Sequence, residues 1–354
     1  MTGVPVPDAA AYTAARERLD ALVKPLGSLG RLEDLAAWLA AAHGEVPPRP
    51  LDDVRVVIFA GDHGVSAGVS AGVSAGVSGV SAYPREVTAA MVRVFLAGKS
   101  GVTVLAGQVG ARVRVLDIAV DWEVAALNDL PDEVTAYKIR RGSGSIDVTD
   151  ALEPGEAERA FDAGRAVADE EIDAGADLLI PGDMGIGNTT IAAALVAGCL
   201  GLDAEKVVGT GTGVDEAGRA HKVAVVSTAL TRAGSRVADP FSLLTAVGSA
   251  CAAATAGFLV QAARRGVPVL LDGVFSGAAA VVARMIEPDA PRWWLAGHRS
   301  TEPSHSLALE ALGLAPILDF GLRLGEGSGA VQAVPTLRAA RAIIADMGLL
   351  ADLG

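Results

Sequence analysis

The sequence predicts an α/β fold: a Rossmann-like, mostly parallel sheet with helices on both faces. Three observations predict it. Short apolar runs rich in Val, Ile and Leu recur along the chain, helical segments separate them, and loops with glycine and charged residues follow several of them. Such runs are typical of strands buried on both faces, and strand–helix alternation favours a parallel sheet. Ligands of these sheets bind at the loops that follow the carboxyl ends of the strands.

Six short segments carry the strand pattern: residues 54–60, 102–106, 112–120, 176–180, 267–271 and 293–296. Four of the loops that follow them hold unusual residues. They read GDHG after residue 60, PGDMGIGNTT after 180, DG after 271 and GHRSTEPSH after 296. Because parallel strands end at one edge of a sheet, we expect these loops to form the functional site.

Helices are predicted at both ends of the chain. Residues 12–23 and 29–42 have helical character, and the segment EVPPRP at 45–50 separates them from the first strand, because proline interrupts a helix. The tail, residues 336–350, is again helical, with Pro335 at its start. The sequence therefore predicts helical ends around an α/β centre.

The composition argues against several classes of protein. The 354 residues are 51% hydrophobic, which allows a large core, and a net charge of −13 gives no basic surface for nucleic acid. The N-terminal segment lacks the apolar core of a signal peptide, which predicts a cytoplasmic protein. The run 243–263 is rich in Ala, Gly, Ser and Thr and is predicted to be a buried core helix, not a membrane span.

Cys199 and Cys251 are predicted to be buried thiols. Asp62 and His63 lack a second histidine at ligand spacing, so no metal site is predicted.

Units of Gly-Val-Ser-Ala repeat from residue 64 to residue 82, between the GDHG loop and the next helix, and residues 66–79 are the central part of this repeat. That helix is predicted to begin near Pro84, with Val87, Met91 and Phe95 on one face. The period of the repeat is too short for a solenoid unit, and its frequent glycines disfavour a helix. The repeat is therefore predicted to be a lengthened loop, either mobile or forming a solvent-exposed flap.

The segment GDMGIGNTT at residues 182–190 follows a predicted strand and opens an Ala-rich helix over 191–200. Glycines let backbone N–H groups approach a ligand closely and a helix N-terminus favours anions, so this loop suits a phosphate. A plain tight turn capped by Asn188 or Thr189 explains the pattern equally well. The loop matches neither GxGxxG nor GxxxxGK[ST], which disfavours dinucleotide and nucleoside-triphosphate sites.

Two further glycine clusters accompany a charged residue. The segment GTGTG at 209–213 precedes a helix that carries Lys222, which either neutralises a phosphate or is a solvated surface lysine. The segment RLGEGSG at 323–329 frames Glu326 with glycines. Its carboxylate is either presented on a turn, where partial burial raises the pKa and makes it a useful base, or it sits at a helix start and complements the helix dipole.

Five segments together resemble the nicotinate-nucleotide–dimethylbenzimidazole phosphoribosyltransferase family. They run in order through nearly the whole chain: KPLGSLGRLE at 24–33, AGDHGV at 60–65, GDMGIGNTT at 182–190, LLDG at 270–273 and RLGEGSGA at 323–330. Each segment alone is weak evidence, whereas the ordered set is specific. The resemblance implies a homodimer of Rossmann-like subunits. Each subunit then has an α/β catalytic domain at 51–330 and a small helical domain built from 1–50 and 331–354.

The resemblance also implies a reaction. Phosphoribose moves from nicotinate mononucleotide to 5,6-dimethylbenzimidazole, giving α-ribazole 5′-phosphate for the lower ligand of cobalamin, and nicotinate is released. By position, Glu326 matches the general base and Asp183 a second carboxylate near the reacting base. The other matching positions are Gly185, Gly187, Asn188, Thr189, Gly211, Lys222 and Ser300 for the nucleotide, and Tyr83, Met91 and Leu324 for the acceptor pocket. Nicotinate leaves through a neutral pyridine nitrogen, so one base is enough and no metal or cofactor is needed. The inversion from β-nucleotide to α-riboside indicates a single displacement.

The chain departs from the family pattern at two places. The family usually carries glutamate where this chain has Asp183, and the shorter side chain is interpreted as orienting the acceptor without contacting it. Relatives also pass from the GDHG loop to the Ser-Ala-Tyr-Pro stretch in fewer residues. Two alternatives stay open: the same transferase with another preferred acceptor, such as adenine or another benzimidazole, and a non-catalytic nucleotide-binding homologue. A nicotinamide-dependent oxidoreductase is disfavoured by the missing GxGxxG.

Overall fold

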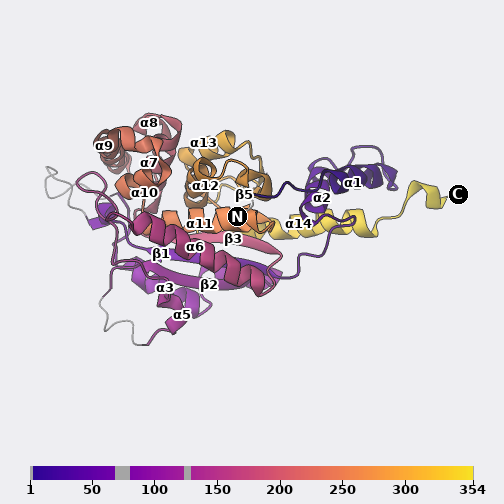
Figure 1. The fold of residues 1–354 in the computed structure, drawn as a ribbon, viewed down its shortest axis with the longest axis horizontal. Coiled ribbons are helices and arrows are strands. Elements are labelled where there is room, and N and C mark those ends of the chain that lie inside the picture. The colour runs from indigo at the N-terminus through magenta and orange to yellow at the C-terminus, as the bar shows by residue number, and fades with distance from the viewer. Residues whose placement is uncertain (1–2, 68–79, 123–128, 354) are drawn as a thin grey trace.

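The computed structural model describes residues 3–67, 80–122 and 129–353, and helices cover both faces of its sheet (Figure 1). Within those residues, six strands form one parallel sheet in the order β2-β1-β3-β4-β5-β6. They are β1 (Val54–Gly61), β2 (Arg112–Ala119), β3 (Leu178–Met184), β4 (Val269–Leu271), β5 (Trp294–His298) and β6 (Pro316–Leu318). The α/β class predicted from the sequence is confirmed.

The helices fill the intervals between and around the strands. Before and between β1 and β2 lie α1 (Ala9–Ala21), α2 (Arg31–His43), α3 (Val87–Leu96) and α4 (Gly101–Val109). The middle of the chain holds α5 (Asp132–Thr135), α6 (Glu156–Asp173), α7 (Asn188–Leu200), α8 (Ala204–Val207), α9 (Glu216–Ala233), α10 (Pro240–Val247) and α11 (Ala250–Arg264). The last part holds α12 (Val274–Ile286), α13 (Pro303–Leu312) and α14 (Ser328–Asp346).

The two faces of the sheet have separate apolar cores. Along β1, Val57 and Phe59 pack with residues of α6, α11 and α12, whereas Val56 and Ile58 pack with residues of α2 and α14. This alternation follows from the two-residue period of a strand. The chain reverses direction across the sheet at β1, because β2 lies on one side of it and β3 on the other. A crevice for ligands is expected at the carboxyl ends of strands at such a switch point.

The two chain ends pack on each other. In Figure 1, α1 and α2 lie beyond one end of the sheet, and α14 runs from the sheet to them. The Arg18 guanidinium donates to the Ile344 carbonyl at 2.6 Å, which ties α1 to the end of α14. Lys24, in the loop between α1 and α2, forms a buried ion pair at 2.9 Å with Glu33 in the first turn of α2. The proposed division at residue 330 stays a prediction, and α14 is one continuous helix across that position.

One predicted strand was wrong, and one strand of the sheet was not predicted. The segment 102–106 is not a strand but the first part of α4, because Ser100 and Thr103 form a reciprocal capping box that starts a helix. A short apolar run does not distinguish the two states by itself. The strand β6 was missed, since three residues, Pro-Ile-Leu, give no periodic signal.

Two predicted helices have different bounds. The tail helix begins at Ser328 instead of residue 336, and Pro335 lies inside α14. The apolar run 243–263 is buried as predicted, but Gly248 and Ser249 divide it into α10 and α11. The Ser249 side chain accepts from the Ala252 amide at 3.1 Å and so starts the second helix.

The next predictions concern the cysteines, the repeat and membrane-spanning segments. Cys251 is buried and Cys199 is partly buried, and both are free thiols. The predicted flap over 66–79 lies outside the described residues, except that Ser66 and Ala67 end a 3₁₀ turn, Gly64–Ala67. One helical run, Val87–Val109, is long and apolar enough to cross a membrane, and it consists of α3 and α4.

Candidate active site

A cavity of about 570 Å³ opens at the carboxyl edge of the sheet. We call it the carboxyl-edge cavity. Its charged walls come from the end of β3, which supplies Asp183, and from the turn before α14, which supplies Arg323 and Glu326. Its remaining lining residues are Tyr83, Val87, Met91, Met184, Gly185, Ile186, Asn188, Thr212, Gly321, Leu322 and Leu324. Loops that are far apart in the sequence therefore meet where the sheet topology predicts a ligand site.

Glu326 is held on an unusual turn. Among the described residues it is the one non-glycine residue with a positive φ, at 66°, and its neighbours Gly325 and Gly327 have φ of 82° and 97°. Its side chain is buried, and Oε2 accepts from the Val102 amide at the start of α4 at 3.2 Å. Burial raises the pKa of Glu326 above its usual range. A buried carboxylate on a strained turn is typical of a functional residue.

Asp183 is the second buried carboxylate of the cavity. Its Oδ2 accepts from the Asn188 side-chain amide at 2.6 Å, across the loop that joins β3 to α7. Burial raises the pKa of Asp183 to about 7, and the nearby charges of Asp272 and Glu326 act in the same direction. Neither Asp183 nor Glu326 has an ion-pair partner within residues 3–67, 80–122 and 129–353. Carboxylates left unpaired in this way are suited to hold or move a proton.

The glycine loop before α7 packs on the GDHG loop. A Cβ at Gly185 would lie 2.2 Å from the Gly61 carbonyl oxygen and 2.7 Å from His63 Nε2, so the close approach requires glycine. His63 is fully buried, and burial lowers its pKa to about 4, which keeps the ring neutral. Asp62 Oδ2 accepts from the Asp121 amide at 2.8 Å. The GDHG loop therefore packs directly against the glycine loop before α7. In the part of the chain that the structure describes, no three metal-binding side chains cluster.

Lys222 is fully buried, so its interpretation as a solvated surface lysine is wrong. Its Nζ donates to Thr189 Oγ1 at 2.9 Å, and burial lowers its pKa. Gly211, with φ of 54°, approaches this pair so closely that a Cβ would lie 2.7 Å from Thr189 Oγ1 and 2.8 Å from Lys222 Nζ. The Gly211 amide donates to Glu302 at 2.7 Å. A buried cation beside two glycine loops is an arrangement suited to an anionic group.

The predicted site residues therefore fall into two adjoining groups. Those that line the carboxyl-edge cavity are Tyr83, Met91, Asp183, Gly185, Asn188, Leu324 and Glu326. Thr189, Gly211 and Lys222 lie together behind them, linked to the cavity by Arg323, which donates to the Gly211 carbonyl at 2.8 Å. Ser300 is buried and joins this second group through Glu302, whose amide donates to its hydroxyl at 3.4 Å. Gly187 lies at the α7 N-terminus, with φ of 95°.

Sequence reasoning missed several residues of the site. Glu302 lies in the GHRSTEPSH loop, which the pattern singled out without assigning this residue a role. Thr88 accepts from the Ile186 amide at 3.1 Å and fixes the glycine loop, and nothing in its sequence context indicates this. Arg323 was visible only as part of the Glu326 motif. Asp272 follows β4, and its amide partners on α14 are 55 and 58 residues away in the chain.

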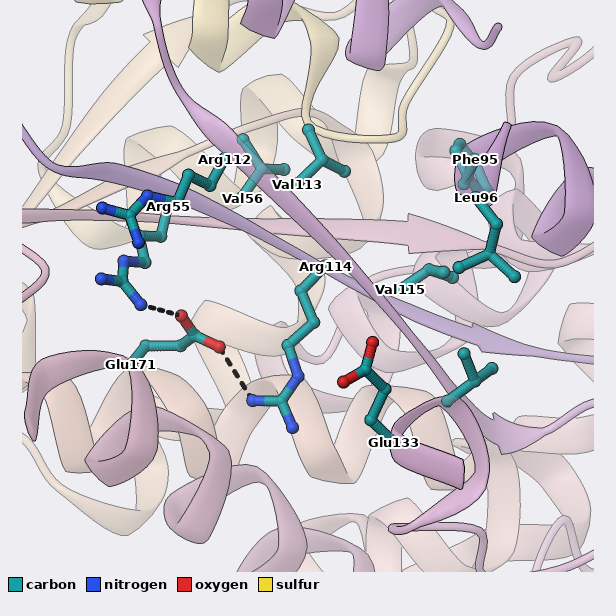
Figure 2. Close-up of a pocket in the computed structure, with 11 residues that line it drawn as sticks. Arg55, Val56, Phe95, Leu96, Arg112, Val113, Arg114, Val115, Glu133 and Glu171 are labelled. Carbon is teal, nitrogen blue, oxygen red and sulfur yellow. Dashed lines mark hydrogen bonds and ion pairs between the residues drawn. The ribbon is translucent and has the colours of Figure 1, made fainter. Parts of the chain in front are cut away.

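A second cavity, of about 360 Å³, lies at the opposite edge, where β1 and β2 begin. We call it the amino-edge cavity. Figure 2 shows Glu171 between two arginines of its wall: Oε2 pairs with Arg55 at 3.0 Å and Oε1 with Arg114 at 2.8 Å. Asp53 pairs with Arg55 at 2.8 Å, and this bond holds the pKa of Asp53 below its usual value. The arginines and carboxylates of this cavity wall are therefore mainly paired with one another.

A family model described as Phosphoribosyltransferase matches residues 4–354, which makes this α/β protein a group-transfer enzyme. Curated relatives named nicotinate-nucleotide–dimethylbenzimidazole phosphoribosyltransferase include one from Mycobacterium avium, 55% identical, with 98% of this chain and 95% of that protein covered. Another, from Mycobacterium tuberculosis, is 52% identical, with 99% and 93% covered. The crystal structure of CobT from Thermus thermophilus has a TM-score of 0.89 and 43% identity, with 98% of both chains covered. The chain belongs to the nicotinate-nucleotide–dimethylbenzimidazole phosphoribosyltransferase family.

Proposed function

We propose that this chain transfers 5-phosphoribose from nicotinate mononucleotide to 5,6-dimethylbenzimidazole, giving α-ribazole 5′-phosphate and nicotinate. The observation that carries the proposal is the Glu326 carboxylate, buried at the wall of a cavity of about 570 Å³ and free of any ion pair with described residues. A cavity of this size accommodates a small aromatic acceptor beside a nucleotide. The names of the relatives supply the two substrates.

Glu326 acts as the general base in this proposal. One benzimidazole nitrogen attacks C1′ of the ribose while the other loses its proton to the Glu326 carboxylate. The bond from C1′ to the nicotinate nitrogen breaks, and its electron pair leaves with nicotinate as a neutral pyridine. No acid is required at the leaving group, and the raised pKa of Glu326 brings the base closer to the operating pH. Attack from the side opposite nicotinate gives the α-product.

The nucleotide is held by residues of both groups. Lys222 supplies the positive charge, and the glycine loop before α7, with Gly185 and Gly187, supplies backbone N–H groups for the phosphate. Gly211 lets its backbone approach Thr189 and Lys222 closely. Asn188, Thr189 and Ser300 complete this set. The reaction uses no metal and no cofactor, because the bond that breaks needs neither a Lewis acid nor a redox partner.

Apolar side chains bind the acceptor. Tyr83, Met91 and Leu324 line the cavity, and Tyr83 and Leu324 are exposed in the isolated chain. Asp183 stands beside them with its carboxyl group fixed by Asn188. With a pKa of about 7, Asp183 is partly protonated at neutral pH, and its short side chain acts on the acceptor without contacting it. It orients the ring while Glu326 removes the proton.

The chain acts as a cytoplasmic homodimer in this proposal. Exposed apolar side chains on α3, α4 and the loop before α14 support a partner surface, among them Leu96, Val104, Phe320 and Leu324. Light scattering of the purified protein tests the oligomeric state. A mass equal to one chain of 35.7 kDa at micromolar concentration contradicts it.

The experiment that tests the function is a product assay with the purified chain. Nicotinate mononucleotide and 5,6-dimethylbenzimidazole should give nicotinate and α-ribazole 5′-phosphate in equal amounts, with the α-configuration visible by NMR. No nicotinate release from correctly folded protein supports the alternative of a non-catalytic nucleotide-binding homologue. A panel that includes adenine and other benzimidazoles tests the remaining alternative, a different preferred acceptor.

A further inference from the structure

A second buried carboxylate lies directly behind the Glu326 turn. Asp272 follows β4, and its side chain is 1% exposed. Its Oδ2 accepts from the Gly327 amide at 3.1 Å and its Oδ1 from the Ala330 amide at 3.0 Å. These are amides at the start of α14, which has no side-chain cap of its own because Gly327 occupies the cap position. Asp272 therefore caps α14 from a neighbouring strand.

His298, at the end of β5, holds Asp272 from the other side. Its Nε2 lies 3.4 Å from Asp272 Oδ1. Burial opposes ionisation of both groups, yet their pairing holds the pKa of Asp272 below its usual value and raises the pKa of His298. The neighbouring His305 stays neutral, because burial lowers its pKa to about 3, and its Nδ1 accepts from the Ser300 amide at 2.9 Å.

The ring of His298 also touches the helix that follows Glu326. A Cβ at Gly329 would lie 2.1 Å from His298 Cδ2 and 2.3 Å from Nε2, so the last glycine of the GEGSG motif is required by this ring. The first two glycines of the motif, Gly325 and Gly327, have positive φ. The motif therefore combines a left-handed turn with a close contact to the Asp272–His298 pair.

The backbone of Glu326 is fixed from the opposite side by β3. A Cβ at Gly182 would lie 2.3 Å from the Glu326 carbonyl oxygen. A glutamate with positive φ is strained and persists only where its surroundings determine it. Here the surroundings are the close backbone contact with β3 and the two hydrogen bonds that backbone amides donate to Asp272.

We propose that Asp272, paired with His298, is a positioning residue for the reaction: it fixes the left-handed Glu326 turn and so aims the Glu326 carboxylate into the carboxyl-edge cavity. The inference rests on the proposed function, in which Glu326 is the base. Positioning matters because a misplacement of about 1 Å in a reacting group costs on the order of a hundredfold in rate.

The test compares Asp272→Asn with a matched control, Asp117→Asn. Asp117 is equally buried, accepts from the Val120 amide at 2.7 Å and from Trp122 at 2.8 Å, and pairs with Lys138. These partners lie in or after β2, away from the Glu326 turn that Asp272 bonds. Asparagine retains one acceptor and loses the other together with the charge. We expect Asp272→Asn to lower kcat by about 10–100-fold while the KM for nicotinate mononucleotide changes less than about threefold. Asp117→Asn should leave kcat unchanged at equal folded fraction.

A double variant separates positioning from general damage. If Asp272 acts through Glu326, then Asp272→Asn lowers kcat in the wild-type background but not in the Glu326→Gln background. An equal loss in both backgrounds overturns the inference, and so does an unchanged kcat in Asp272→Asn when Glu326→Gln is slow. Normal turnover of Glu326→Gln overturns the proposed base as well, which distinguishes the two failures. His298→Gln keeps the Asp272 carboxylate, so this variant tests the positioning role if Asp272→Asn does not fold. It should lower kcat about 3–10-fold. An unchanged kcat overturns the role of the Asp272–His298 pair.

Discussion

At the amino edge of the sheet, each arginine of the cavity wall is paired with a carboxylate, whereas at the carboxyl edge Asp183 and Glu326 have no cationic partner among the described residues. The pKa values follow this difference. The bond to Arg55 lowers the pKa of Asp53, while burial raises that of Asp183 to about 7. Both cavities bury charge, and only one leaves it free to exchange protons.

The comparison shows how to separate a structural ion network from a reaction site. Glu171 bridges Arg55 and Arg114, which holds α6 against β1 and β2 (Figure 2). Neutralising charges this way satisfies the buried groups but removes their chemistry. Glu326 instead accepts one backbone amide, from Val102, and keeps its other oxygen available. An unpaired, buried carboxylate is the more informative sign of function.

The largest expected effect is that of Glu326→Gln. Turnover should fall by about 10²–10⁴-fold, because the amide cannot accept the acceptor's proton, and nucleotide binding should persist. The pKa of Glu326 is raised in the folded protein, so its ionised form destabilises the fold above the pKa of the unfolded chain. The variant should therefore be no less stable than the wild type at pH 8. Near-normal nicotinate release would remove Glu326 from the mechanism.

The matching change at the amino edge is Glu171→Gln. It breaks the bridge between Arg55 and Arg114 and leaves a buried arginine with a weaker acceptor, so the free energy of unfolding should fall by about 1–3 kcal/mol. Turnover per folded molecule should stay at the wild-type level. Denaturant titration and steady-state kinetics on the same sample measure both. Loss of turnover without loss of stability would contradict the structural role of this cavity.

Lys222→Met separates binding of the nucleotide from the chemical step at Glu326. Methionine keeps most of the stem volume and removes the buried charge, so we expect the KM for nicotinate mononucleotide to rise about tenfold or more while kcat falls less. Phosphate lies away from the bond that breaks. Because burial lowers the pKa of Lys222, losing the charge should not lower the melting temperature. An unchanged KM would show that the phosphate binds elsewhere.

How far the sequence predicted these features depends on the range of the interactions involved. The glycine motif around Glu326 and the loop at Asp183 were identified, because local turn chemistry leaves a local pattern. The burial of Lys222 was not identified, since a lysine on a helix is usually exposed and its neighbours Thr189 and Glu302 come from distant parts of the chain. The segment 102–106 was assigned as a strand because its apolar pattern fits either state, and the capping residue Ser100 decided the outcome.

The smallest expected effect concerns the repeat at residues 66–79, which lies almost wholly outside the described residues. Deleting two Gly-Val-Ser-Ala units should leave the melting temperature nearly unchanged, because the entropy of closing a loop depends weakly on its length. The KM for the acceptor tests whether the loop acts as a flap. A large drop in melting temperature would show that its valines are core residues.

The most direct test of the contrast between the two edges is a carbon-13 NMR titration of protein labelled at the aspartate carboxyl carbons. Asp183→Asn and Asp53→Asn assign the two resonances. We expect Asp183 to titrate near pH 7 and Asp53 below its ordinary value of 3.8. Because the pKa of Asp183 is raised on folding, its ionisation should lower stability as the pH rises from about 4 to about 7. If Asp183 instead titrates at or below 3.8, the carboxyl edge holds a compensated charge and the account of the site is wrong.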